Sequence, residues 1–172
     1  MDLKFYKCDT KKHKKGDFKK VAFDKKKTMT LIEKKLLISD LCARLPYGVK
    51  VDCTDGIVQL ECVDFELGYD NPVFWYGGNG TNLTIENDNI KPYLIPISKM
   101  TEEQRLEIEI ITGETIGIDT YSLYDFTGYS EISLSRTMEL IQWCYENHID
   151  INGLIPMGLA NDATNLNIYI DL

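Results

Sequence analysis

A glycine-rich stretch, Gly77–Thr81, is the first group of residues whose types and spacing could do chemistry. Backbone N–H groups in such a loop can cradle a phosphate, and a P-loop adds a lysine and a serine or threonine that open a helix. No lysine follows here, and the flanking residues alternate like strands. A hairpin loop is therefore the favoured interpretation, and Gly78 and Asn79 stay as candidate ligand-binding residues.

Three aromatic residues, Phe74, Trp75 and Tyr76, stand directly before this loop. Trp75 and Tyr76 beside flexible glycines could stack on a nucleobase or another ring. Aromatic residues in a short strand more often pack in a core or along a sheet edge. Both interpretations stay open at this point.

The third group, Arg44–Tyr47, stands where a predicted helix ends. A planar guanidinium suits bidentate capture of a carboxylate or phosphate, and Tyr47 could contribute a ring to the same ligand. The competing interpretation is a cation that satisfies the last carbonyls and the dipole of its own helix, and His148 is explained in the same way. The predicted ligand-binding residues are Arg44, Tyr47, Trp75, Tyr76, Gly78 and Asn79.

No catalytic residue, metal ion or cofactor is expected. The five cysteines, at positions 8, 42, 53, 62 and 144, are odd in number and have no C-x-x-C spacing, so they indicate neither a disulfide framework nor a zinc site. Two histidines cannot build a multi-histidine metal centre within one chain. No nucleophile motif is present, and the acidic residues are scattered.

Helices must position these groups, and three are predicted, over about 30–45, 101–112 and 134–148. Capping boxes begin the first two, at Thr30 and Thr101, with Glu33 and Gln104 at the third helical position. The first helix carries leucines at every fourth residue, which is the period of a helix buried on one side.

Strands are predicted on both sides of a turn at Asp55-Gly56. Pairing across this turn places Val51 opposite Leu60, and the alternation changes phase beyond Cys62, which indicates a bulge. Further strand candidates are 73–76, 83–85 and 90–94, with a C-terminal strand over 166–172. The predicted fold class is α+β: a small bent antiparallel sheet or an SH3-like barrel over about 48–97, three helices and a C-terminal strand.

Charge divides the chain unevenly. Residues 1–50 hold fifteen Lys and Arg against six Asp and Glu, whereas residues 51–172 hold four against twenty-one, so net charges of +9 and −17 make up the total of −8. We predict a lysine-rich N-terminal segment over 1–29, either a hairpin or an arm, and a single α+β domain over 30–172. The lysines favour a solvated arm, or a contact with the acidic body of this chain or of a neighbouring subunit.

Membranes and nucleic acid are not expected as partners. No segment approaches the ~20 apolar residues of a membrane span, and the charged N-terminus does not resemble a secretory leader. The lysine-rich segment lacks arginine, which reads bases bidentately, and no helix-turn-helix or RNP motif accompanies it. The chain is therefore expected in the cytoplasm.

Three stretches carry a resemblance: Asp40–Val49, Ile90–Pro96 followed by Met100–Glu103, and Gly153–Ala160. They resemble a group of uncharacterised proteins encoded by phages and prophages of gut anaerobic bacteria, over roughly residues 36–105 and 137–160. The resemblance implies a mobile genetic element and a bacterial host cell. It implies no particular activity.

Two functions from different classes follow. The first is a phage-encoded, non-enzymatic binding protein that counters a host defence by sequestering a nucleotide-like immune signal, in a pocket that a homo-oligomer would form between subunits. The alternative is an acidic protein–protein inhibitor or adaptor of a host protein, including the form of a DNA mimic. A small enzyme ranks last.

Overall fold

A six-stranded open sheet lies at the centre of the computed structural model, which describes residues 29–65, 72–78, 81–85, 89–113 and 133–169. The strands are β1 (Lys50–Cys53), β2 (Gly56–Asp64), β3 (Val73–Tyr76), β4 (Thr81–Thr84), β5 (Lys91–Leu94) and β6 (Asn161–Asp162). Their order is β4-β3-β2-β1-β5-β6, and every pair is antiparallel except β5 with β6. The α+β prediction is confirmed. The SH3-like barrel alternative is wrong, because β4 and β6 are the two edges of an open sheet. The lysine-rich residues 1–28 lie outside the described residues.

The β1–β2 hairpin forms with a register two residues away from the predicted one. Val51 pairs with Val58 instead of Leu60, and Cys53 pairs with Gly56. The physical reason is Gly56, whose φ of 100° supplies the left-handed residue after the turn instead of inside it. Since side chains alternate with a period of two, this shift leaves each residue on its predicted face. A bulge is present, between Leu60 and Cys62, just before the predicted position beyond Cys62.

All three predicted helices are confirmed, as α1 (Leu31–Arg44), α3 (Glu102–Thr112) and α5 (Leu134–Glu146). Both capping boxes form, with reciprocal hydrogen bonds between Thr30 and Glu33 and between Thr101 and Gln104. A one-turn helix, α6 (Leu154–Met157), was not predicted.

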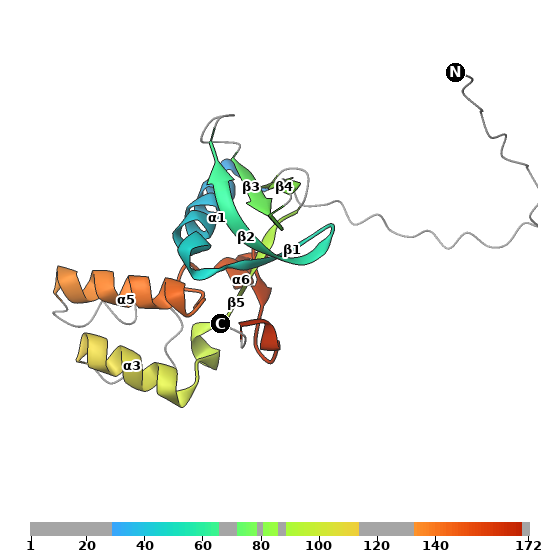
Figure 1. Cartoon of the computed structure of the whole chain (residues 1–172). Helices are drawn as coiled ribbons and strands as arrows, with labels where there is room; N and C mark the ends of the chain where they lie inside the picture. Colours follow the sequence, from blue (N-terminus) through green and yellow to red (C-terminus); the bar gives the residue numbers. More distant parts are fainter. Residues whose placement is uncertain (1–28, 66–71, 79–80, 86–88, 114–132, 170–172) are drawn as a thin grey trace, which may run out of the picture.

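Two hydrophobic clusters hold these elements. The first packs α1 on one face of the sheet, and its fully buried members include Leu37, Leu41, Val51, Leu60, Phe74 and Leu94. The second joins α3 to α5, with Ile97, Met100, Ile108, Leu140, Cys144 and Ile149. Figure 1 shows α3 and α5 side by side as a helical layer away from β2, β3 and β4.

The predicted C-terminal strand is wrong over its described part. Residues Asn167–Tyr169 form a 3-10 helix, and residues 170–172 lie outside the described residues. Within this segment the side chain of Tyr169 reaches the sheet: its hydroxyl donates a hydrogen bond to the carbonyl of Tyr93 and accepts one from the N–H of Lys50.

Candidate functional site

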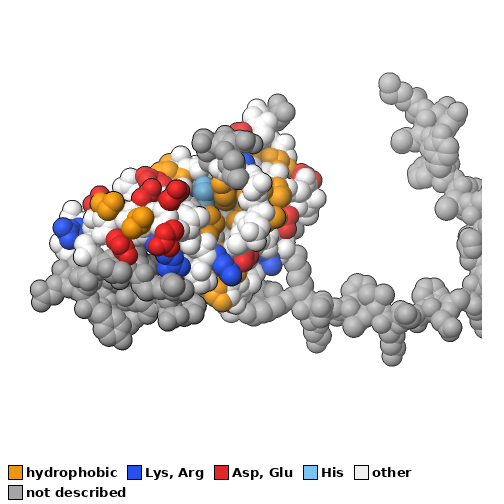
Figure 2. Space-filling view, turned by 90° about the horizontal axis from the view of Figure 1, so that it is seen from below, with side chains coloured by type: hydrophobic (Ala, Val, Ile, Leu, Met, Phe, Trp, Pro, Cys, Tyr) orange, Lys and Arg blue, Asp and Glu red, His pale blue; other side chains and the backbone are white. Residues whose placement is uncertain are grey.

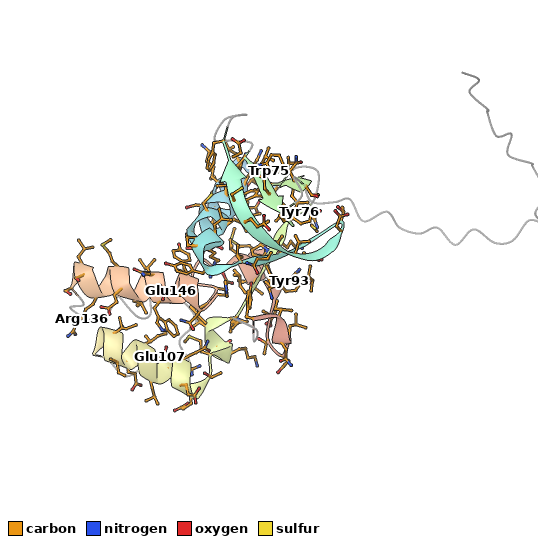
Figure 3. The ribbon with its side chains drawn as sticks, in the orientation of Figure 1. Trp75, Tyr76, Tyr93, Glu107, Arg136 and Glu146 are labelled. Atoms are coloured by element: carbon orange, nitrogen blue, oxygen red, sulfur yellow. The ribbon has the colours of Figure 1, made fainter. Side chains whose placement is uncertain are left out.

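Two of the predicted ligand-binding residues, Trp75 and Tyr76, point to opposite faces of the sheet. Successive residues of a strand alternate in direction, and Tyr76 is buried in the cluster under α1 while Trp75 is half-buried on the other face. The hydroxyl of Tyr76 donates to a carboxylate oxygen of Asp55. Figure 3 shows both side chains on β3, well away from Glu146 on α5.

The glycine-rich loop contributes one described contact. The backbone N–H of Gly78 donates to Oε2 of Glu61 over 3.2 Å. Asn79 lies outside the described residues. The N–H of Gly78 is therefore occupied by a carboxylate of the same chain. Ligand binding by this loop stays a prediction.

Arg44 is fully buried and its guanidinium is engaged on every side. It donates from Nε and Nη2 to the two carboxylate oxygens of Asp40, over 2.8 and 3.1 Å, one turn earlier on α1. It also donates to the carbonyls of Ile149, over 2.8 Å, and Cys144, over 3.4 Å. Its Cζ lies 4.9 Å from the ring centroid of Tyr145. The bidentate geometry expected of this arginine is present, with a carboxylate of the same chain as the acceptor.

Arg44 lies in the last turn of α1, as the competing interpretation requires, but the carbonyls it satisfies are those of Cys144 in α5 and of Ile149. The expected hydrogen bonds to the last carbonyls of its own helix are therefore replaced by contacts with another element. Asp40 accepts a further hydrogen bond from Asn152, whose Nδ2 donates to Oδ1 over 2.8 Å. Asp150 accepts from the N–H groups of Leu154 and Ile155 and so begins α6. Burial raises the pKa of Asp150, and these two hydrogen bonds oppose the rise.

His148 follows α5 in a left-handed backbone conformation, with φ of 54°, and is 3% exposed. Burial, reinforced by the charge of Arg44, lowers its pKa to about 4, so the ring is neutral at pH 7. The interpretation of His148 as a helix-end cation is therefore wrong. The backbone of Tyr47 lies close enough to raise the pKa against these two effects, although neither ring nitrogen makes a hydrogen bond of normal geometry among the described residues.

A groove of about 730 Å³ runs between the end of α1 and α5, and Tyr47 is the predicted site residue that lines it. Its other lining residues are Ala43, Ser135, Met138, Glu139, Ile141, Gln142 and Tyr145. Two tyrosines and three aliphatic side chains make this lining mostly apolar, and Glu139 is the charged residue among the described lining. A smaller groove of about 260 Å³ lies near Met29, Lys91 and Met157.

The outer face of α3 exposes a stripe that sequence reasoning missed. Glu103, Leu106, Glu107 and Ile110 follow helical spacings of three, one and three, and Leu106 and Ile110 are 52% and 81% exposed. Figure 2 shows hydrophobic side chains surrounded by acidic ones over this helix. Trp143 of α5 donates to Glu107 over 2.7 Å, which fixes that carboxylate at the rim. The spacing in the sequence carries a signal, because Leu106 and Ile110 lie on the opposite side of a helix from Ile108, and the three cannot all face one core.

The described residues contain no group of three or more His, Cys, Asp or Glu placed to hold a metal ion. None of the described helices is both long enough and apolar enough to cross a membrane. No family model matches the chain, and neither the curated proteins nor the solved structures yield a match.

Arg44→Met is expected to lower the free energy of unfolding by about 3–5 kcal/mol, because it leaves the carboxylate of Asp40 buried and without its cation. Urea unfolding measures this. The control is Arg136→Met, an exposed arginine that donates to the carbonyl of Thr112, for which a loss below about 1 kcal/mol is expected. Equal losses for the two variants would contradict the central role of Arg44.

The stability of the protein is expected to fall as the pH decreases from about 6.5 toward 4. The pKa of His148 is about 4 when folded and near 6.5 when unfolded. The unfolded chain therefore takes up the proton first, which favours unfolding by up to about 3 kcal/mol. His148→Phe keeps a ring against Tyr169 and removes this term, and Asp150 titrates in both proteins. The free energies of unfolding of the native chain and of His148→Phe, measured between pH 7.5 and 4.5, should therefore converge or cross as the pH falls. Two parallel pH dependences would refute the lowered pKa of His148.

Proposed function

We propose that the protein is a non-enzymatic binding protein that docks on a basic surface of another protein through the outer face of α3. The observation that carries this proposal is the exposure of Leu106 and Ile110 between Glu103 and Glu107. Large exposed apolar side chains ringed by polar ones are typical of interaction surfaces. Apolar contact would supply binding energy, and the carboxylates would select a cationic partner.

The wider charge distribution supports the same partner class. Residues 51–172 carry a net charge of −17 with four basic residues. Three of these four lie near the helical layer: Lys99 is exposed just before α3, Arg105 is buried, and Arg136 donates to the end of α3. The helix α3 itself carries four glutamates, so the surface around the stripe is predominantly acidic, which would steer a basic protein toward it.

The resemblance to phage proteins supports a bacterial host protein as this partner. Host proteins that bind nucleic acid present basic surfaces of this kind, so an inhibitor acting as a DNA mimic is one form of the proposal. Counter-defence would follow if that partner belongs to a host immune system.

A synthetic amphipathic helix with lysines on one side and leucines on the other is a defined probe of the α3 face. We expect it to bind the full chain and to perturb the backbone NMR signals of residues 103–110. Ile110→Gln should weaken binding roughly tenfold at any salt concentration, because an apolar contact is lost. Glu103→Gln should weaken it mainly at low salt.

Met138→Gln and Glu146→Gln are the matched controls, because both residues are exposed on α5. They should leave binding of the peptide unchanged. Losses as large as those at Ile110 and Glu103 would argue against the α3 face. A host protein captured from lysate supports the proposal when Ile110→Gln releases it and Met138→Gln does not.

The groove between α1 and α5 supports a second candidate, sequestration of a nucleotide-like ligand. The rings of Tyr47 and Tyr145 both line it and could stack on a base. Arg44 lies behind Tyr145 but is occupied by Asp40. The groove therefore suits the base of such a ligand better than its phosphates.

Cyclic and NAD-derived nucleotides test this candidate by thermal shift, together with heat release and identification of any bound molecule. One of them should raise the melting temperature of the native chain, and Tyr47→Ala should abolish that rise. Trp75→Ala, on the far face of the sheet, is the control that should preserve it. If no bound molecule is recovered and no nucleotide changes the melting temperature, the sequestration hypothesis is refuted. The mass of the protein in solution tests the expected homo-oligomer in the same sample.

A further inference from the structure

The hydroxyl of Tyr169 bridges the backbones of β1 and β5. Strands β1 and β5 pair Asp52 with Lys91 and Val51 with Pro92, so Lys50 and Tyr93 come next in the same register. The hydroxyl bridges these two residues: it accepts from the N–H of Lys50 over 3.1 Å and donates to the carbonyl of Tyr93 over 2.9 Å. Strands β1 and β5 thus offer one donor and one acceptor to a phenol.

The ring of Tyr169 is recognised as specifically as its hydroxyl. The imidazole of His148 stacks on it at a centroid distance of 3.8 Å and an angle of 15°. The ammonium of Lys50 lies 5.8 Å from the ring centroid and donates to the carbonyl of Ile168. A planar wall, a cation and a donor–acceptor pair together define a slot for an aromatic ring that bears a hydroxyl.

His148 supplies an independent observation. It is 3% exposed, and Nδ1 and Nε2 both lack a hydrogen-bond partner among the described residues. Native structures seldom bury polar atoms unpaired, and such atoms call for an explanation. The Tyr169 side chain pairs neither nitrogen, so the imidazole meets the phenol ring by stacking.

The segment Ala163–Tyr169, here called the strap, is anchored at its two ends and exposed at residues 165–167. The N–H of Ala163 donates to the carbonyl of Leu94 over 2.8 Å, and Lys50 binds the carbonyl of Ile168. Leu166 is 44% exposed, and Asn165 has a left-handed φ of 64°. A segment that buries little apolar surface opens at low free energy, so a competing ligand can exchange with it.

We propose that the slot formed by His148, Lys50 and Tyr93 is a binding site for phenols, and that Tyr169 occupies it as an intramolecular ligand. A free phenol or a tyrosine side chain of another protein would displace the strap and take the same contacts. This site is separate from the α3 face and from the groove of Tyr47, so it stands or falls independently of the proposed function.

Chemical rescue of Tyr169→Ala tests the slot. The full chain carrying this change should melt at a lower temperature, and 4-methylphenol should restore a large part of the loss. Toluene at the same concentration should restore much less, since it lacks the hydroxyl. We expect 4-methylphenol to bind this variant at least tenfold more tightly than it binds the native chain. N-acetyltyrosine amide replaces it in a parallel arm, which separates peptide-borne from free phenols.

Tyr145→Ala is the matched control, because Tyr145 lines the other groove. Its thermal response should not distinguish 4-methylphenol from toluene. Equal rescue of Tyr169→Ala by the two compounds, or no rescue by either, would overturn the proposal.

Tyr169→Phe decides the question if Tyr169→Ala fails to fold. It keeps the stacked ring and loses only the bridging hydroxyl, so 4-methylphenol should compete with it. Hydrogen exchange of residues 163–169 should then accelerate at least threefold with 4-methylphenol and not with toluene. Unchanged exchange of the strap in this variant would refute the displacement.

Discussion

The buried pair of Arg44 and Asp40 is the interaction on which the rest of the structure depends. One guanidinium joins α1 to two carbonyls of another element. Cys144 lies in the last turn of α5, and Ile149 lies three residues after the end of that helix. Each of these groups would be costly if left alone in the interior. The pair therefore fixes where α5 ends relative to α1.

Everything proposed to bind a partner inherits its position from this junction. The groove of Tyr47 is lined by residues from the end of α1 and from α5, the two elements that Arg44 joins. The α3 stripe faces outward because α3 packs on α5 through Ile108 and Leu140. His148 reaches the slot of Tyr169 because the chain turns there in a left-handed conformation directly after α5.

Local signals in the sequence predicted most of the elements. Capping boxes at Thr30 and Thr101, leucine periodicity and the strand alternation near Val51 each depend on residues close together in the chain. The roles of Arg44, His148 and Tyr169 were not predictable in the same way. Asp40 is local to Arg44, one helical turn earlier, but the other hydrogen-bond partners are distant in the chain. Arg44 and Ile149 are separated by 105 positions, Tyr169 and Tyr93 by 76, and Tyr169 and Lys50 by 119. Residue type alone suggested binding for Arg44, and the fold uses that chemistry internally.

The two edges of the sheet carry a consequence for association between chains. An exposed strand edge with free backbone groups is a template for aggregation, and short or polar edge strands prevent it. Here β6 is two residues long and ends at the charged Asp162, while β4 exposes Thr81 and Asn82. Neither described strand offers a long apolar ladder to a second chain. The molecule can therefore present apolar side chains on a helix for recognition without also inviting its sheets to polymerise.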